Sequence, residues 1–595
     1  GFATGTWRTG GTAEDRLPGH LTLQGELTRA NGTRVHRYLP VAIPELTRHY
    51  VRDAVRGGRA TRTTFAVDSG LDHFPPRNAQ EGVFRIVADL DDVDFDYVPE
   101  SVAERTHQPV RWPALAGLDA QLVFDRIDMD VRGARGRFAD FPQLKVAETS
   151  ARIAGLGQAE PVLEINGRVG GPMAQALGYV QHSPLDALAG GAFARSQATG
   201  DAAIQLALRI PLHDASATTV VGTTQIQQAD LRLTPEAPVL AQTQARVDFT
   251  EHGFKVSNAR TRLLGGELQF SGQGEQEGRP EAGAGAGDIA AGRAPGQAAD
   301  PAPSAPRRRL AVQFEGQGTV TADGLVHAHE LPLLAQIGSQ LEGQTRYSAR
   351  LTSAGGQLQA RFDSDLQGLA SSLPAPFAKT AETALPVRFE ASPTGTQQDR
   401  VAFQLGERIK AVFERDLSAS YPRVRRGAIQ IDEHQAPEAA LPASGVDLGL
   451  KLDTVDVSAW QALLTAPGAD DDASPGALPS TAAGMASAAL RAHAVAGPAD
   501  GEGRGRSEAQ DGNPQSAHAA ALASFLPTRI DVQARELRFA NRSIHNLRAS
   551  GTHRQGTWSA DVSADEVQGQ LRYSQGAGCL LYTSDAAGDM QCVDL

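Results

Sequence analysis

The sequence predicts a mainly β protein with a few short helices, and three observations lead to that fold class. Apolar and polar residues alternate with period two along many segments, as in strands that have one apolar and one polar face. The connections between these segments are rich in turn formers, and the 595 residues include 62 Gly and 34 Pro. The regular alternation of strand and helix that a doubly wound fold requires is absent.

The first predicted strand contains Leu21 and Leu23, and a longer one starts with Phe84 and Ile86. In the longer strand the apolar phase shifts by one residue at Asp91-Asp92, which predicts a bulge because the side chains would otherwise change faces. Further alternating runs are Leu122/Phe124, Ile204/Leu206/Leu208/Ile210, Val247/Phe249, Leu310/Val312/Phe314, Val401/Phe403/Leu405, Ile409/Ala411/Phe413, Val446/Leu448/Leu450/Leu452, Ile530/Val532/Ala534 and Val567/Gly569/Leu571/Tyr573.

Three short helices are predicted between the strands. The first runs from Glu45 to Val55 and stops before Gly57, a favourable C-terminal cap. Pro172 opens the second, which presents Met173, Ala176, Leu177 and Val180 on one face, and Ser458 caps the third. Because the helices are too few to match the strands one for one, we expect them to lie over the sheet as plugs or lids.

Two stretches without periodicity, 274–308 and 466–522, divide the chain into β segments at 1–273, 309–465 and 523–576. Their Gly-, Ala-, Pro- and Ser-rich composition buries too little apolar area to offset the entropy of ordering, so both are expected to be disordered low-complexity insertions.

The last segment, 577–595, departs from the pattern of the preceding chain. Its sequence from Cys579 to Ala587 resembles a translated sequencing adaptor, so we interpret 577–595 as an artefactual tail and assign no role to Cys579 or Cys592. The first residues resemble neither a signal peptide nor an initiating Met, and the chain is expected to be an internal fragment.

Composition and motifs exclude several functions. The net charge is −13, and the densest basic run, Arg307-Arg308-Arg309, is too short to follow a phosphate backbone, so nucleic acid is not an expected partner. The sequence contains no run of 18 or more apolar residues, which is the length that a membrane-spanning helix requires. Phosphate-binding loops, nucleophile elbows and zinc-protease motifs are absent, and we predict no enzyme, no catalytic residue and no cofactor.

Two clusters resemble metal sites in composition, and both favour a solvent-exposed interpretation. His327 and His329 share one face of an expected strand but lack a third ligand. The second cluster has the carboxylates that a calcium ion could use, from Asp89, Asp91, Asp92, Asp94 and Asp96. Because Asp92, Asp94 and Asp96 alternate with apolar residues and no glycine turn of a calcium loop is present, they are predicted to form the wet face of a strand. No metal site is predicted.

The apolar face of the strands is the remaining candidate for function. It is aliphatic with some Phe, and it recurs strand after strand. Periodicity alone allows two interpretations: the buried core of a sandwich or barrel, or the inner face of an open trough for an apolar ligand.

A set of collinear motifs resembles the middle region of the YhdP family, large AsmA-like, TamB-related envelope proteins of Gram-negative bacteria. The motifs are Leu71-Asp72-His73-Phe74-Pro75, Glu81-Gly82-Val83-Phe84-Arg85-Ile86, Tyr97-Val98-Pro99, Arg111-Trp112-Pro113-Ala114-Leu115, Ser183-Pro184-Leu185, Leu208-Arg209-Ile210-Pro211-Leu212, Leu264-Gly265-Gly266, Asp363-Ser364-Asp365-Leu366-Gln367-Gly368-Leu369, Leu373-Pro374-Ala375-Pro376-Phe377-Ala378-Lys379, Arg426-Gly427-Ala428-Ile429, Leu441-Pro442 and Val567-Gln568-Gly569-Gln570-Leu571.

The resemblance implies an elongated, twisted antiparallel β-sheet that curls into an apolar groove. It also implies a periplasmic protein anchored in the inner membrane, with phospholipid, both membranes and other envelope proteins as partners, the anchor and membrane-contacting ends lying outside this sequence. The implied function is lipid transfer that supports the outer-membrane permeability barrier. Predicted groove residues are Leu21, Leu23, Phe84, Ile86, Ile204, Leu206, Val401, Phe403, Val446 and Leu448.

Two alternatives stay open at this point. A periplasmic scaffold for outer-membrane biogenesis would have a closed, dry core and would carry no lipid. A β-rich enzyme acting on polysaccharide would need two carboxylates paired in a cleft.

Overall fold

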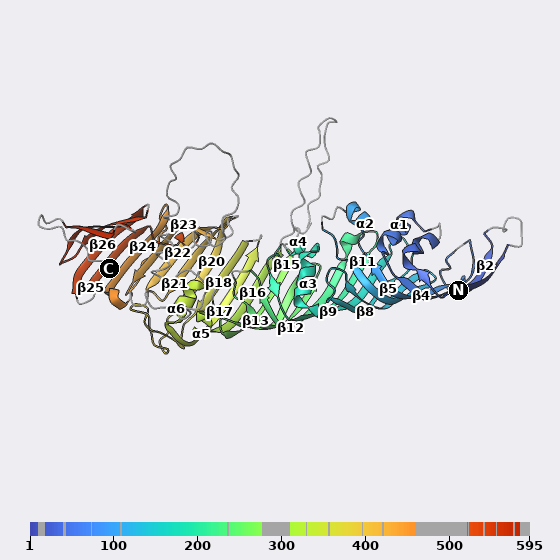
Figure 1. Cartoon of the computed structure of the whole chain (residues 1–595), viewed down its shortest axis with the longest axis horizontal. Coiled ribbons are helices and arrows are strands. Elements are labelled where there is room, and N and C mark those ends of the chain that lie inside the picture. The colour runs from blue at the N-terminus through green and yellow to red at the C-terminus, as the bar shows by residue number, and fades with distance from the viewer. Residues whose placement is uncertain are drawn as a thin grey trace, which may run out of the picture. The chain divides into compact units, whose positions relative to one another are not determined.

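The structure is a computed structural model of the whole chain (Figure 1). It describes residues 1–9, 18–39, 43–72, 74–106, 110–189, 191–234, 237–276, 310–328, 330–354, 357–395, 397–418, 422–459, 521, 523–539, 542–554, 556–574 and 578–583. The chain divides into two compact units, which are described separately. Unit 1 comprises Gly1–Arg262, Gln269–Gln313 and Ala354–Gly356; unit 2 comprises Leu263–Leu268, Phe314–Ser353 and Gln357–Leu595.

The strands of unit 1 pair antiparallel in an open sheet, in the order β1–β2–β4–β5–β6–β7–β8–β9–β11–β12–β13–β14. The short strands β3 and β10 add to β4 and β12. The bounds are β1 (Phe2–Arg8), β2 (His20–Leu27), β3 (Ala30–Asn31), β4 (Arg59–Gly70), β5 (Gly82–Phe95), β6 (Leu115–Asp125), β7 (Asp128–Phe138), β8 (Lys145–Ile153), β9 (Val162–Pro172), β10 (Gln197–Ala198), β11 (Asp201–Pro211), β12 (Thr219–Arg232), β13 (Leu240–Thr250) and β14 (Gly253–Leu263).

Bulges interrupt most of these strands. The bulge that the phase shift in the sequence predicts is confirmed: Asp92 has φ 53°, and the β5–β6 register shifts between Leu90 and Val93. Equivalent register shifts coincide with left-handed residues at Gly117, Gly133, Glu148, Gln228, Gln242 and Asn258. A bulge bends its strand and keeps apolar side chains on one face across a phase shift, so the strands can stay amphipathic on both sides of each bulge.

The helices of unit 1 lie between strands, in the blue-to-green part of Figure 1. They are η1 (Gly32–Tyr38), α1 (Glu45–Ala54), α2 (Glu100–Arg105), α3 (Met173–Gln181), α4 (Leu185–Leu188) and η2 (Ala215–Ala217). The predicted helices at Glu45 and after Pro172 are confirmed as α1 and α3. Pro172 precedes α3 as its N-cap residue, where its missing N–H costs no helix hydrogen bond.

Unit 2 has the same kind of sheet. Its strands are β17 (Leu341–Ala354), β18 (Gln357–Ser364), β19 (Leu369–Ser371), β20 (Val387–Gly395), β21 (Gln398–Leu405), β22 (Ile409–Asp416), β23 (Arg423–Asp432), β24 (Gly445–Asp456), β25 (Arg529–Phe539), β26 (Arg542–Arg554), β27 (Thr557–Ser563), β28 (Gln568–Ser574) and β29 (Gly578–Thr583). β15 (Gly266–Gln276) and β16 (Leu310–Thr321) have residues in both units, and α5 (Ala322–Val326) and α6 (Pro332–Gly338) precede β17.

Strand direction in unit 2 departs from a purely antiparallel sheet. The pairs β23–β24 and β24–β25 are parallel, whereas β18–β20–β21–β22–β23 and β25–β26–β27–β28–β29 are antiparallel. Parallel neighbours need a crossover instead of a tight turn. The crossover between Asp432 and Gly445 runs over the polar face, where Lys410 Nζ lies 2.5 Å from Glu438 Oε1.

The predicted fold class is confirmed, since the structure is mainly β with about 60% strand, 12% helix and an open rather than closed sheet. The insertions predicted at 274–308 and 466–522 and the helix predicted at Ser458 lie almost entirely outside the described residues. In the segment predicted as an adaptor tail, Gly578–Thr583 forms β29 beside β28, and the residues after Thr583 are outside the described part.

Candidate functional site

The apolar side chains of unit 1 form continuous rows across the sheet. Each member of a row pairs directly with the next on the adjacent strand, so all lie on one face, called here the apolar face. One row runs through Phe65, Ile86, Phe124, Met129, Ile153, Leu163 and Ile210. A second row runs through Ala88, Leu122, Val131, Ala151, Ile165, Leu208 and Val220.

The six candidate residues of unit 1 all lie on this face. Leu23 pairs with Val67, which pairs with Phe84, and Leu21 is two residues from Leu23 on the same strand. Ile86 belongs to the first row. Ile204 pairs with Val169 on one side and Thr224 on the other, while Leu206 pairs with Gly167 and Gly222.

The apolar face of unit 2 is built in the same way. Its central row runs through Phe362, Phe389, Phe403, Ala411, Ile429, Leu448 and Ile530. A neighbouring row runs through Ala391, Val401, Phe413, Gly427 and Val446. The four candidates of unit 2, Val401, Phe403, Val446 and Leu448, therefore share one face, and the change to parallel pairing leaves the rows unbroken.

Burial distinguishes these faces from a dry core. Leu23, Phe84, Ile86, Ile204 and Leu206 are half-buried, and so are Phe403 and Leu448. Only Val401 and Val446 among the ten candidates are buried, with 6% and 1% of their surface exposed. Residues at the centre of a closed sandwich would be almost fully buried. The half-buried rows match an open sheet whose apolar side chains cover one another only partly.

The opposite face of unit 1 carries charge. Cross-strand ion pairs join Arg85 to Asp125 at 3.2 Å and Arg152 to Asp128 at 3.0 Å. The exposed pair of Arg209 and Glu164 follows on β11 and β9 at 3.7 Å. Such pairs add little stability in water, but they make the two faces chemically distinct.

Phenylalanine rings lie flat on the apolar face because glycines stand opposite them. Gly25 pairs with Phe65, Gly222 with Phe249, and Gly427 with Phe413. In each pair a Cβ built on the glycine would overlap the phenylalanine ring, so the ring occupies the place of the missing side chain. The rings thereby cover backbone without rising from the sheet, which keeps the face even.

Helix α3 covers part of the unit 1 face. A buried cluster joins Ala176 of α3 to Phe138, Val146, Val169 and Ala202 of the sheet. Met173 and Tyr179 of α3, together with Ile204 and Leu206, pack against that cluster. The expectation that a helix lies over the sheet is confirmed here, and two of the candidate groove residues lie at its edge.

A tyrosine network connects α3 with the rest of unit 1. The hydroxyls of Tyr97 and Tyr179 are 2.9 Å apart, and the hydroxyl of Tyr50 on α1 donates to the carbonyl of Tyr97 at 3.2 Å. Burial raises the pKa of Tyr50 and of Tyr179 to about 12. The pKa of Tyr97 is raised as well, chiefly by burial and further by the Tyr179 hydroxyl. These phenols are therefore neutral hydrogen-bonding groups near neutral pH.

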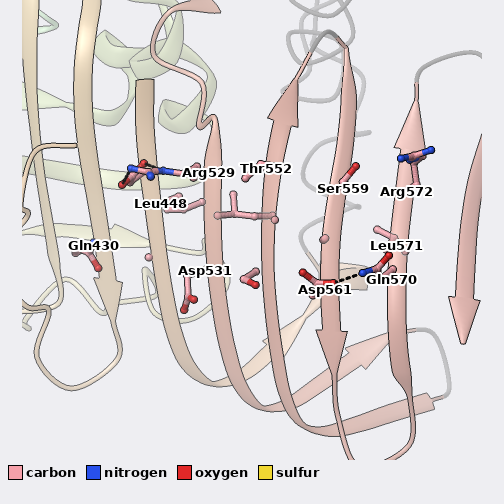
Figure 2. A pocket seen from close by; sticks show the side chains of 16 residues that line it. Gln430, Leu448, Arg529, Asp531, Thr552, Ser559, Asp561, Gln570, Leu571 and Arg572 are labelled. Atoms are coloured by element: carbon pink, nitrogen blue, oxygen red, sulfur yellow. Dashed lines mark hydrogen bonds and ion pairs between the residues drawn. The ribbon is translucent and has the colours of Figure 1, made fainter. Parts of the chain in front are cut away.

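Unit 2 contains a hollow of about 820 Å³ lined by residues of β23 to β28 (Figure 2). Its lining includes Leu448 and Ile530 of the central apolar row, as well as polar residues that alternate with that row. Among the polar residues, Arg529 forms a two-point ion pair with Asp447, and Gln570 Nε2 donates to Asp561 Oδ1 at 2.9 Å. The lining thus includes two pairs of polar groups that already satisfy one another.

The two clusters that resemble metal sites in the sequence lie in different surroundings in the structure. His327 was expected on a strand, which is wrong: it follows α5, with Nδ1 2.8 Å from the Asp323 carbonyl oxygen, because the segment makes a helical turn. His329 lies outside the described residues. Asp91 and Asp96 pair with Arg59 and Arg56. Within the described residues, no group of three potential ligands could hold a metal ion.

Several residues of the face were not among the sequence-based candidates. Phe65, Phe124, Met129, Ile153 and Leu163 occupy the same row as Ile86. Some of them lie in segments that do alternate, such as Leu122/Phe124 and Met129/Val131, but alternation within one segment does not show which residues of other segments they meet. The signal that identifies them is cross-strand register, which a single strand does not contain.

Among the described helices, none has both the length and the apolar character needed to cross a membrane. Neither the curated proteins nor the solved structures contain a match to the chain. The model of the YhdP protein family matches residues 2–291 and 298–583. The match covers both described units and agrees with the motif resemblance in the sequence. The chain belongs to the YhdP family, an AsmA-like family of cell-envelope proteins.

Proposed function

We propose that this chain is a section of a non-enzymatic lipid-transfer bridge, which carries phospholipid acyl chains along its apolar faces across the periplasm. In this function it connects the inner and outer membranes and supports the outer-membrane permeability barrier. The observation that carries the proposal is the continuity of the half-buried apolar rows from strand to strand.

The energetic requirement of such a bridge is large. Exposing one methylene to water costs about 0.8 kcal/mol, so two acyl chains with roughly 30 methylenes represent on the order of 20 kcal/mol. A half-buried aliphatic row can replace much of the water around these chains. The zwitterionic or anionic headgroup would stay in water beside the face, where its solvation is kept.

The chemistry of the rows suits movement rather than tight binding. Ile86, Phe124, Met129 and Ile153 offer no hydrogen bond to an acyl chain, so no position along the row holds the chain by a directional contact. The flat rings of Phe65, Phe249 and Phe413 keep the path free of steps. Dispersion contacts are similar from one strand to the next, which leaves only small barriers between successive positions.

The proposal is tested by measuring lipid on the purified chain by mass spectrometry. We expect phospholipid to co-purify with the chain, and we expect Phe403→Asp to reduce it strongly because a carboxylate then interrupts the central row of unit 2. Gln404→Asp is the matched control, since Gln404 is the next residue on the same strand, exposed and on the opposite face. If the unmodified chain carries no phospholipid, a scaffold acting by protein contacts replaces the lipid bridge.

A further inference from the structure

The segment that carries α3 is an excursion from an otherwise regular hairpin. Strands β9 and β11 pair without any register shift, from Val162 opposite Pro211 to Pro172 opposite Asp201. The residues between Pro172 and Asp201, including α3 and α4, therefore form the loop of this hairpin. The end of this loop, β10, pairs with β12. The β9–β11 ladder is nevertheless complete without α3 and α4, so these two helices are not needed to set its register.

The base of the loop is narrow and flanked by glycines. The backbone N–H of Met173 donates to the carbonyl of Gly200 at 2.7 Å, which closes the loop where it leaves the sheet. Gly171 and Gly200 have φ values of 157° and 82°. Gly200 lies in the left-handed region, where side chains are strained, and such residues absorb backbone rotation easily. Gly171 pairs with Ala202 in the ladder, and β10 between α4 and Gly200 pairs with β12, so the sheet holds both ends of the loop.

Helix α3 returns to the apolar face, where the Tyr179 hydroxyl contacts the segment after β5. Farther along the loop, Gln181 Nε2 of α3 donates to the Ser196 carbonyl at 3.1 Å, and the Ser196 hydroxyl donates to the Leu233 carbonyl at 2.9 Å. The Tyr179 ring lies 4.7 Å from Phe138 and 6.2 Å from Phe141, centroid to centroid. Its hydroxyl is 2.9 Å from that of Tyr97, which follows β5. Beneath this contact, the cluster with Ala176 occupies the part of the face to which Ile204 and Leu206 belong.

We propose that α3 and α4 form a lid over this part of the unit 1 face, which moves between its two held ends at Pro172 and β10 and is fastened by the hydrogen bond between Tyr97 and Tyr179. The lid in place keeps the apolar surface at Ile204 covered when no acyl chain is present. An arriving acyl chain replaces Met173, Ala176 and Tyr179 on the sheet, exchanging one set of apolar contacts for another. The proposal rests on the proposed lipid-transfer function.

The test compares a position beside the lid with a position away from it. A diazirine-bearing aliphatic amino acid replaces Ile204 in one variant and Ile86 in another, and the probe is a vesicle of phosphatidylethanolamine and phosphatidylglycerol. Lipid adducts are quantified by mass spectrometry after illumination of the full chain. Cys579 and Cys592 are replaced by Ser throughout, so that Tyr97→Cys and Tyr179→Cys can be joined by a bis-maleimide that spans the space of the two rings.

We expect the linker to reduce the lipid adduct at Ile204 at least about fivefold and to leave the adduct at Ile86 unchanged. Tyr179→Phe removes the fastening bond and should raise the adduct at Ile204 about fivefold, the factor that corresponds to one net hydrogen bond. Tyr50→Phe is the matched control, since Tyr50 bonds the carbonyl of Tyr97 and leaves the hydroxyl pair in place.

Each other outcome contradicts one specific statement. Equal labelling at Ile204 with and without the linker would show that lipid reaches this surface without any movement of α3, which overturns the lid. Labelling at Ile86 but never at Ile204, even in Tyr179→Phe, would make α3 a fixed wall. Absence of lipid from both positions would overturn the proposed function itself.

Discussion

The glycine opposite Phe249 gives a direct test of how even the apolar face is. Gly222→Ala places a methyl group where the ring of Phe249 now lies, because a Cβ at this position overlaps the ring. Carbon atoms rest about 3.5–4.0 Å apart, so the ring must move by more than about 1 Å. We expect it to rise from the sheet into the space above the face.

The magnitude follows from two opposing effects. Overpacking of this kind costs about 1–3 kcal/mol. Replacing Gly by Ala also restricts the unfolded chain, which returns about 0.4–1 kcal/mol. The expected net loss of stability is therefore about 1–2 kcal/mol. Gly170→Ala is the matched control, because a Cβ on Gly170 would lie 3.8 Å from the Ala202 carbonyl oxygen, its nearest neighbour beyond the adjacent residues, and no ring must move.

Urea unfolding followed by circular dichroism measures the difference between these variants. With a slope of about 2 kcal/mol/M, Gly222→Ala should lower the midpoint by roughly 0.5–1 M, whereas Gly170→Ala should raise it slightly. Adding Phe249→Leu to Gly222→Ala should recover most of the loss by removing the displaced ring. Equal midpoints for the two alanine variants would refute the placement of the Phe249 ring on Gly222.

Two further predictions concern buried polar groups. With the lid closed, the pKa of Tyr179 is raised to about 12, and the pKa of Tyr97, which also faces Asp96, is raised too. The closed lid therefore favours the neutral phenols. The stabilisation that they give to the closed lid is complete below the ordinary tyrosine pKa of 10 and is lost as the pH rises above it. Lipid labelling at Ile204 should therefore increase between about pH 10 and pH 12, and a flat profile would contradict this. Arg415→Met should destabilise unit 2 by about 3–5 kcal/mol in urea unfolding, because Asp399, only 7% exposed, loses its partner at 2.5 Å.

The sequence predicts the class of fold and part of its detail. Alternation identifies the strands, and the phase shift before Val93 places the bulge of β5 correctly, because a strand with one apolar face can absorb a one-residue shift only by bulging. The bulges at Gly133 and Glu148 are not predictable in this way, since small or charged residues around them hide the change of phase. The direction of β24 is not predictable either, because parallel and antiparallel strands share the same alternation.

The candidate face was predictable only strand by strand. Leu21 and Ile204 were identified from their own segments, but their membership of one surface depends on register, which hydrogen bonds between distant segments determine. The amphipathic pattern after Pro172 correctly indicates α3, whereas the surface that α3 covers follows from the hairpin geometry of β9 and β11. Sequence patterns therefore give the elements, and tertiary pairing gives the site.

The crossover between Asp432 and Gly445 has a consequence for how such a protein can change over time. It gives β24 the same direction as β23 and so interrupts the antiparallel order of unit 2. The connection nevertheless travels over the charged side, where Lys410 meets Glu438, and the row from Ile429 to Leu448 continues beneath it. If the strands are connected in a different order by segments that cross that side, the new connections add only hydrated polar surface. Substitutions of charge within the row would instead interrupt it. We therefore expect evolutionary freedom in topology to coexist with strict constraint on hydrophobicity, two properties that most folds tie together.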